Sequence, residues 1–292
     1  MSATPHTTTH WLPKLVIAPS FVLSLLFIYG LMAWNGYLSF SASRILPNYE
    51  WVGLAQYETL FGNERFRVAL TNLAIFGVLF IGGAMALGVV LAVLLDQKVR
   101  GEGVLRTIYL YPMAISFIVT GTAWKWMLNP GLGLEHLMHQ WGFEGFTFDW
   151  LVNPEMAIYC VVIAGVWQSA GFVMALFLAA LRGIDDSIIK AAQVDGASLP
   201  TIYTRIILPS LRPVFFSTLM VVSHLAIKSF DLVMALTAGG PGFSTDLPAT
   251  FMYAHAFTRG QIGLGAASAT VMLATVAAIV VPYLYSELRT KR

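Results

Sequence analysis

The chain has 292 residues, of which 57% are hydrophobic and only 11% are charged. A soluble domain carries about 25% charged residues, and several apolar runs in this chain reach the roughly 20 residues with which a helix crosses a bilayer. The composition therefore predicts an all-α polytopic membrane protein, since no stretch shows the alternation over about ten residues that is typical of a transmembrane β-strand. The net charge of +2 gives no indication of nucleic-acid binding.

The N-terminal residues and the single cysteine narrow the class further. Residues 1–14 contain Lys14 and no acidic residue. The apolar run that follows is longer than the ~7–15 residues of a signal-peptide core and ends without an A-x-A cleavage pattern. We therefore expect a cytoplasmic tail at 1–14 and an uncleaved first transmembrane helix. Cys160, the only cysteine, lies inside an apolar run, which excludes an intrachain disulfide and argues against a cysteine-based metal site.

Apolar segments follow one another along the chain, and each is predicted to be a transmembrane helix: 15–38, 68–95, 105–127, 156–181, 211–236 and 264–286. Six crossings place both termini on the same side of the membrane, within one transmembrane domain at 15–292. Lys and Arg concentrate in the termini and in the loops at 96–106 and 182–212, whereas the 129–155 loop has no basic residue. By the positive-inside rule, both termini and the 182–212 loop lie in the cytoplasm.

The fourth predicted span carries the polar stretch Trp167-Gln168-Ser169 near the middle of the bilayer. A tryptophan that stacks on a sugar face, with an amide beside it, fits a carbohydrate site. Trp167 alone is also compatible with lipid contact or helix packing. Gln168 is the stronger candidate because an unpaired amide in hydrocarbon is costly.

The cytoplasmic loop at 182–210 contains an ordered, turn-punctuated stretch, KAAQVDGASLPTIYTRIILP. Asp185 or Asp186 can cap a short helix, and Gly196 can end that helix by adopting a positive φ. Pro200 is acceptable in the first turn of a second short helix. The sequence therefore predicts a helix-turn-helix between the fourth and fifth spans.

This segment has two interpretations. An amphipathic helix-turn-helix can lie on the inner leaflet, or a short helix with a small apolar face can lie in the groove of a partner protein. The segment has few basic residues, and Ala191 and Ala192 suit close packing against protein better than contact with lipid. These features favour the protein partner.

The spacing of the segment resembles the cytoplasmic loop of bacterial ABC importer permeases, in which E-A-A is followed by three residues, a Gly, nine residues and I-x-L-P. In this chain every position of that pattern agrees except the first, where Lys190 replaces the usual Glu. The resemblance implies that the loop at 187–209 couples the chain to an ATPase. The residues implied in coupling are Lys190, Ala191, Ala192, Asp195, Gly196, Ile206, Leu208 and Pro209.

The resemblance covers nearly the whole chain. Residues 229–242 and 250–257 look like the sugar-uptake branch of these permeases, and 11–20, 106–130 and 281–289 resemble more narrowly the proteobacterial glucose/mannose importer permease. Related permeases move disaccharides and glycerol phosphate. The family implies a multi-pass protein of the bacterial inner membrane that moves a sugar from the periplasm to the cytoplasm by alternating access.

The same resemblance implies the partners of the chain. They are a second homologous permease, two copies of a cytoplasmic ATPase that hold ATP and Mg, and a periplasmic sugar-binding protein. The chain itself has no P-loop pattern G-x-x-x-x-G-K-[ST]. We therefore expect a transport subunit that is not an enzyme and holds no cofactor.

The fifth predicted span offers polar residues that fall on one side of a continuous helix: Ser217, His224, Lys228 and Asp231. Lys228 and Asp231, at i and i+3, can pair and offset each other's desolvation. The stripe either lines the sugar pathway or packs against the partner permease. An ion-coupled secondary transporter is a weaker hypothesis, because Asp231 is the only acidic residue clearly within a span.

Beyond the fifth span, the TAGGPG stretch at 237–242 predicts a shaped loop at the outer face. Gly239, Gly240 and Pro241 all favour turn conformations. This loop either contacts the binding protein, shapes the outer gate, or is a plain tight turn. His136 and His139 lie at i and i+3 near Glu135 in an outer loop, but without further ligands a metal site there is disfavoured. An intramembrane protease is disfavoured because the adjacent Ser223 and His224 point about 100° apart on a helix.

Overall fold

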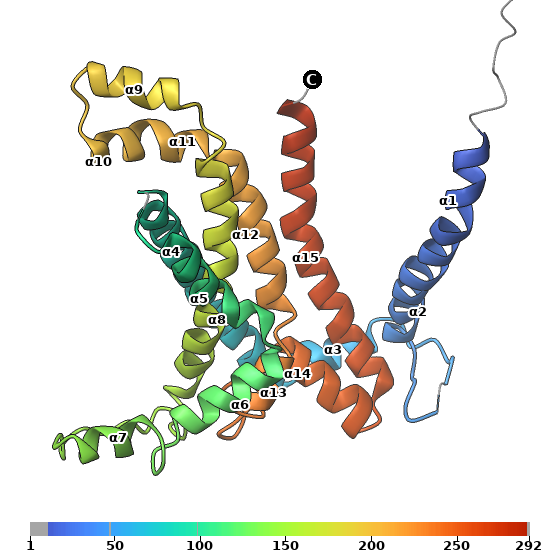
Figure 1. Ribbon diagram of the computed structural model, residues 1–292. Helices are drawn as coiled ribbons and strands as arrows, with labels where there is room; N and C mark the ends of the chain where they lie inside the picture. Colours follow the sequence, from blue (N-terminus) through green and yellow to red (C-terminus); the bar gives the residue numbers. More distant parts are fainter. Residues whose placement is uncertain (1–10, 47, 98, 291–292) are drawn as a thin grey trace, which may run out of the picture. The chain divides into compact units, whose positions relative to one another are not determined.

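The computed structural model describes residues 11–46, 48–97 and 99–290 (Figure 1). Most of the predicted cytoplasmic tail, residues 1–10, and the C-terminal basic residues Lys291 and Arg292 lie outside this description. Within the described ranges the structure is helical, and no strand forms beyond one isolated bridge between Ser41 and Trp51. The predicted all-α class is confirmed over these ranges.

The helices in chain order, with π-helical turns labelled η, are α1 (Trp11–Ser24), η1 (Leu25–Tyr29), α2 (Gly30–Ser39), α3 (Ala55–Gly62), α4 (Glu64–Asp96), α5 (Glu102–Ala114), α6 (Phe117–Met127), α7 (Leu134–Gln140), α8 (Ala157–Leu181), α9 (Asp186–Val194), α10 (Leu199–Ile202), η2 (Tyr203–Ile207), α11 (Leu208–Ser210), α12 (Arg212–Ile227), α13 (Asp231–Leu236), α14 (Pro248–Tyr253), η3 (Ala254–Thr258) and α15 (Ile262–Thr290). They form two compact units, which we describe separately. The first contains the described residues up to Leu60 together with Met252–Thr270, and the second contains the rest.

Four helical segments are long and apolar enough to cross a membrane: Lys14–Ser39, Glu64–Asp96, Ala157–Leu181 and Ile262–Tyr285. They coincide with the first, second, fourth and sixth predicted spans. Two bent helix pairs raise the possible number to six: Glu102–Ala114 with Phe117–Met127, bent by 101°, and Leu199–Ser210 with Arg212–Ile227, bent by 68°. We assign Leu199–Ser210 to the cytoplasmic loop predicted at 182–210.

The third predicted span, 105–127, is broken in the structure. Ile115 is extended after α5, and Ser116 caps α6 by accepting a hydrogen bond from Val119 N at 3.3 Å. Pro112 near the end of α5 lacks the N–H that a continuing helix needs. The fifth predicted span, 211–236, is also interrupted, since α12 ends at Ile227 and α13 begins only at Asp231.

In the first unit, the amide side chain of Asn35 fastens α2 to the start of α15. Its Nδ2 donates to Ala266 O at 3.3 Å and to Thr270 Oγ1 at 3.2 Å. Both bonds give partners to an amide that would be costly to leave unpaired in an apolar setting. The α1 helix, by contrast, exposes its hydrophobic side chains from Leu15 to Leu23, as a lipid-facing helix does.

The core of the second unit lies where α4 packs along α8. Phe76 and Phe80 of α4 are fully buried there and stack with ring centroids 5.1 Å apart. The neighbouring α5 crosses α8 so closely that a Cβ added at Gly171 would lie 1.9 Å from Tyr109 O. Small residues at such crossings are typical of membrane helices, because close backbone approach replaces the missing hydrophobic driving force.

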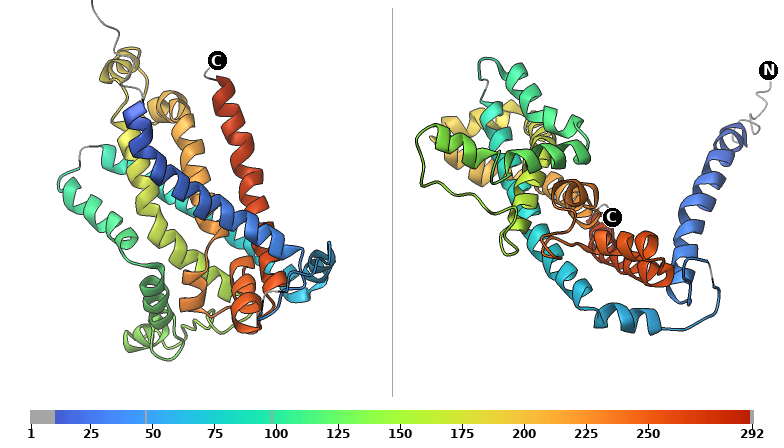
Figure 2. Two further views of the ribbon diagram at one scale, coloured as in Figure 1. Left: turned by 90° about the vertical axis from the view of Figure 1, so that its right-hand side faces the viewer. Right: turned by 90° about the horizontal axis from the view of Figure 1, so that it is seen from below.

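The helix-turn-helix predicted between the fourth and fifth spans is present. Figure 1 shows α9 alongside α10 and α11, and the left-hand view in Figure 2 shows this segment beyond the C-terminal end of α8. Because α12 follows α11 almost directly, the pair is continuous with the next apolar helix.

Candidate functional site

The first half of the predicted coupling segment folds as its sequence indicates. Asp185 caps α9, and its Oδ1 accepts a hydrogen bond from Ser187 N at 2.8 Å. Hydrogen bonding to Ser187 holds the pKa of the Asp185 carboxyl below its usual range. The helix ends at Val194, and Gly196, just beyond the C-cap Asp195, has a φ of +79°, which glycine adopts without strain. Ala197 N then donates to Ala192 O at 3.0 Å, which satisfies a carbonyl at the helix end.

The second half is not one regular helix. It runs from α10 through a π-helical turn, Tyr203–Ile207, into α11. Pro209 explains the turn, because a proline has no N–H to donate to the carbonyl four residues earlier and its ring crowds that carbonyl. Ile202 and Ile207 are fully buried and anchor this half to the core of the second unit.

The residues predicted to contact an ATPase differ in their exposure. Those exposed are Lys190, Ala191, Asp195, Gly196 and Pro209; Ala192 is buried, and Ile206 and Leu208 are half-buried. Val194, which sequence reasoning missed, is 88% exposed, and Ile188 and Leu199 are also exposed. Exposed apolar side chains on a short helix-turn-helix are typical of a surface that a partner covers.

A cleft of about 640 Å³ separates α9 from the ends of α4, α5 and α8. Lys190 lines this cleft, together with the ion pair between Glu102 and Arg182, whose Oε1 and Nη2 atoms lie 2.6 Å apart. Tyr203 reaches Asp96 across it, and burial together with that carboxylate raises the pKa of the phenol to about 12. The phenol is therefore protonated, and a donor, at neutral pH.

The polar stretch of the fourth span faces two different cavities. Gln168 is 3% exposed, and its Nε2 donates to Ile115 O at 2.8 Å, at the break between α5 and α6. Its Oε1 has no hydrogen-bond partner among the described residues, and the side chain lines a cavity of about 170 Å³ together with Ser169. Trp167 instead lines a neighbouring cavity of about 210 Å³, where its ring lies edge-on to Trp124 at 5.9 Å.

The polar residues predicted on the fifth span do not form one continuous stripe. Lys228 ends α12 and Asp231 begins α13, so the helical i, i+3 spacing is interrupted. No ion pair joins these two side chains in the described part of the chain. Ser217, whose Oγ lies 3.0 Å from Tyr283 Oη, is exposed, as are His224, Lys228 and Asp231.

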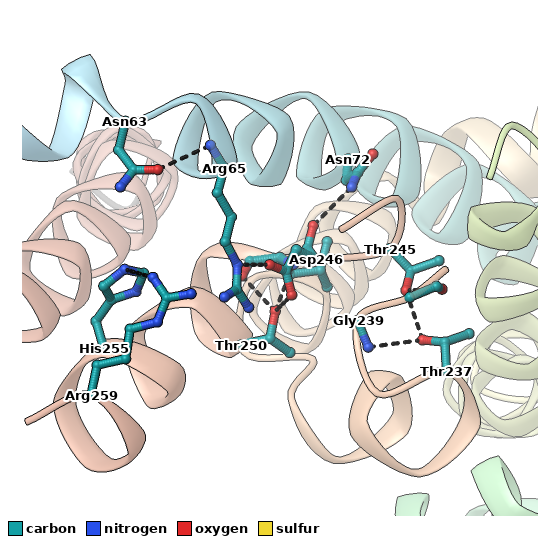
Figure 3. A network of polar contacts seen from close by, with 12 residues as sticks. Asn63, Arg65, Asn72, Thr237, Gly239, Thr245, Asp246, Thr250, His255 and Arg259 are labelled. Atoms are coloured by element: carbon teal, nitrogen blue, oxygen red, sulfur yellow. Dashed lines mark hydrogen bonds and ion pairs between the residues drawn. The ribbon is translucent and has the colours of Figure 1, made fainter. Parts of the chain in front are cut away.

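The predicted loop at 237–242 is held by a polar network that the sequence did not reveal (Figure 3). At its centre, the buried carboxylate of Asp246 pairs with Arg65 Nε and accepts a hydrogen bond from Thr250 Oγ1 at 3.0 Å. The backbone carbonyl of Asp246 accepts from Asn72 Nδ2 at 3.0 Å. Arg65 and Asn72 both belong to the first turns of α4, so this loop is fastened to the beginning of that helix.

The glycines of the loop fit this network closely. Gly239 has a φ of +87°, and a Cβ at this position would lie 2.5 Å from Asp246 Oδ1. The hydroxyls of Thr237 and Thr245 lie 2.7 Å apart, and Thr245 Oγ1 also lies 3.0 Å from Gly240 O, ahead of the cis peptide bond to Pro241. These contacts and the positive φ give the stretch a defined shape.

The sequence pattern of one protein family, described as "Binding-protein-dependent transport system inner membrane component", matches residues 84–290. The chain belongs to this family. A probable ABC transporter permease of Pyrococcus horikoshii is 40% identical over 93% of this chain and 94% of its own length. The xylose/arabinose import permease of Haloferax volcanii is 36% identical over 91% of this chain and 85% of its own length.

A solved structure supports the fold. The crystal structure of a bacterial ABC transporter involved in the import of the acidic polysaccharide alginate contains a chain similar to this one, with a TM-score of 0.84. The likeness covers 97% of this chain and 96% of that chain at 22% sequence identity. The chain is thus an integral membrane permease with the fold of ABC importers.

Proposed function

We propose that this chain is the permease subunit of an ATP-driven importer for a sugar, with glucose or mannose as the first candidates. The observation that carries the proposal is the exposed helix-turn-helix between the fourth and fifth predicted spans, in a chain of the binding-protein-dependent family. ATP-driven closure of a separate ATPase moves this segment, and the helices switch between inward-facing and outward-facing states.

The assembly that we propose contains a second homologous permease, two ATPase copies that hold ATP and Mg, and a periplasmic sugar-binding protein. The description of the family as binding-protein-dependent supports the last partner. Both termini and the 187–209 segment face the cytoplasm, as the distribution of basic residues predicts, and the chain lies in the inner membrane. No step of ATP hydrolysis is assigned to this chain.

The sugar passes the cavity at the break between α5 and α6. Gln168 offers a buried Oε1 that no described residue satisfies, and such an acceptor is costly to leave unpaired unless a ligand or water reaches it. Ser169 lines the same cavity. Trp167 and Trp124 line the neighbouring one, where an aromatic face can stack on a pyranose ring.

Other candidate functions follow from the relatives and from the sequence. The similar permease for xylose and arabinose favours another sugar over a different class of substrate, and glycerol phosphate is a further candidate. An ion-coupled secondary transporter would move its substrate without any ATPase. Uptake of labelled sugar by this chain alone in proteoliposomes would overturn the proposed function.

The decisive experiment compares Gly196→Val with Gly142→Val in the reconstituted assembly. Both glycines have a positive φ, +79° and +90°, with no atom near an added Cβ, so both variants suffer backbone strain alone. We expect Gly196→Val to lower sugar uptake per ATP hydrolysed, because the strain distorts the coupling segment. Gly142→Val, after α7, leaves that ratio unchanged. Equal ratios for Gly196→Val and the wild type would show that the break is incidental.

A second measurement tests the substrate. Cells that lack this chain should lose uptake of labelled glucose, and complementation with the chain should restore it. Undiminished glucose uptake in those cells would exclude glucose as the main substrate. Parallel assays with labelled mannose, xylose and glycerol phosphate then identify the substrate class.

A further inference from the structure

The cleft beside the coupling segment gives α9 room to move. Its volume of about 640 Å³ lies between α9 and the ends of α4, α5 and α8. Lys190 and Gln193 of α9 line the cleft, while Ala192 of the same helix is buried in the core of the second unit. Movement of α9 therefore changes the cleft on one side, and the contact at Ala192 joins it to the core helices on the other.

One polar contact bridges the cleft at the second half of the segment. Tyr203 Oη donates to Asp96 Oδ2 at 2.5 Å, and Gln97 Nε2 donates to Tyr203 Oη at 2.6 Å. The phenol thus joins η2 to the last residue of α4 and to its C-cap, more than 100 positions away along the chain. A hydrogen bond to a carboxylate is about twice as strong as one between neutral groups, so this is the firmest polar contact between the two elements that the described residues show.

The helix that receives this contact is well suited to carry movement across the membrane. The α4 helix is unbroken over 33 residues, which corresponds to about 50 Å at 1.5 Å per residue. In contrast, the α5–α6 pair is bent by 101°, and α12 is separated from α13. The other end of α4 holds the outer loop through Arg65 and Asp246.

We propose that Tyr203 is a positioning residue for transport, which fastens the coupling segment to α4 so that ATP-driven movement reaches Asp246 and the outer loop at 237–242. This inference rests on the proposed function, because it assumes a coupling segment moved by an ATPase. Through the chain itself, the segment is joined to α8 before it and to α12 after it. The Tyr203 hydroxyl adds α4 as a further, unbroken route to the outer face.

The test is Tyr203→Phe in the purified assembly of permease, ATPase and binding protein in proteoliposomes. This variant keeps the ring and removes the hydroxyl. We expect normal assembly and ATP hydrolysis, while sugar transported per ATP hydrolysed falls about tenfold, in the range of one lost hydrogen bond to a charged group. Thr204→Val is the matched control, because the Thr204 hydroxyl on the same turn donates only to Pro200 O at 2.8 Å in its own segment.

Substitutions at Asp96 make the test independent of how Tyr203→Phe folds. Asp96→Asn keeps an acceptor oxygen for the phenol and should retain most coupling, whereas Asp96→Ala should match Tyr203→Phe. The double variant Tyr203→Phe/Asp96→Ala should show no further loss, because both changes remove one interaction. A merely structural contact would instead lower the thermal midpoint of the assembly and leave the transport ratio unchanged.

The outcomes distinguish the positioning role of Tyr203 from the proposed function. The positioning role of Tyr203 is overturned if Tyr203→Phe transports as much sugar per ATP hydrolysed as the wild type. It is also overturned if Asp96→Asn and Asp96→Ala give equal ratios. Neither result affects the proposed function. If sugar uptake by the wild type does not depend on ATP, the proposed function is overturned, and the positioning role of Tyr203 is overturned with it.

Discussion

Replacing Arg65 with Met removes the cation that compensates the most deeply buried carboxylate of the described chain. The Asp246 side chain is 1% exposed and that of Arg65 is 17% exposed, so the ion pair is largely shielded from water. Breaking a buried pair by removing one partner costs about 3–5 kcal/mol. Because Thr250 still donates to the carboxylate at 3.0 Å, we expect the lower end, about 3 kcal/mol.

The assay is thermal unfolding of the purified assembly in detergent. A loss of about 3 kcal/mol corresponds to a midpoint lowered by roughly 6–12 °C, at about 2–4 °C per kcal/mol for a chain of this size class. Arg67→Met is the matched control, because exposed Arg67 lies on the same helix and donates only to Phe61 O at 3.1 Å and Gly62 O at 3.2 Å. Arg67→Met should change the midpoint by no more than an ordinary surface substitution does.

A double variant checks the electrostatic part of the reasoning. Arg65→Met/Asp246→Leu leaves no unpaired charge, so it should recover much of the stability that Arg65→Met loses. Equal shifts for Arg65→Met and Arg67→Met would refute the reasoning, since the Arg65 pair would then be worth no more than an exposed contact. A double variant less stable than Arg65→Met would also contradict it, because the buried carboxylate would not be the source of the cost.

Three further changes test other parts of the structure. Lys190→Glu should retain sugar uptake, because Lys190 is exposed and forms no ion pair among the described residues; a large loss would indicate an acidic complement on the ATPase. Gly171→Ala should lower the thermal midpoint, since its Cβ would meet Tyr109 O at 1.9 Å, while Gly77→Ala, with open space around it, should not. Gln168→Leu should raise the KM for sugar uptake and spare basal ATP hydrolysis, and an unchanged KM would remove Gln168 from the pathway.

Segment length and local turn chemistry were enough to predict the elements whose physics is local. The predicted span 156–181 matches α8 at Ala157–Leu181, because an uninterrupted apolar run of this length has few alternatives to a buried helix. Gly196 was expected to adopt a positive φ from its place after a short capped helix, and its φ is +79°. The side of the membrane on which each loop lies, and the coupling role itself, stay predictions.

Hydropathy did not reveal where apolar runs break. The run at 105–127 stays apolar across Ile115 and Ser116, so its average is that of one helix, yet the chain turns by 101° there. Pro112 was the available signal, because it removes a helical hydrogen bond just before the turn. Lys228 and Asp231 looked like one helical pair for the same reason, since the interruption between α12 and α13 leaves no mark in composition.

Contacts between distant residues were beyond the reach of any local pattern. Arg65 and Asp246 are separated by 181 positions, and Tyr203 and Asp96 by 107. In the sequence, each of these side chains reads as an ordinary polar residue near the end of an apolar run. Only the fold brings them together, and it does so at the two ends of α4.

This arrangement gives α4 a role that its apolar sequence does not suggest. A helix fixed at one end alone can tilt without consequence for the other end, but α4 is held by Arg65 at its first turn and by Asp96 at its last residue. Both contacts involve a carboxylate, and both are stronger than neutral hydrogen bonds. Because helices in a close-packed bundle move as rigid bodies, displacement of Tyr203 shifts the loop that Asp246 anchors. Loss of either contact should therefore uncouple transport, but only loss of the buried Arg65 pair should also cost several kcal/mol of stability.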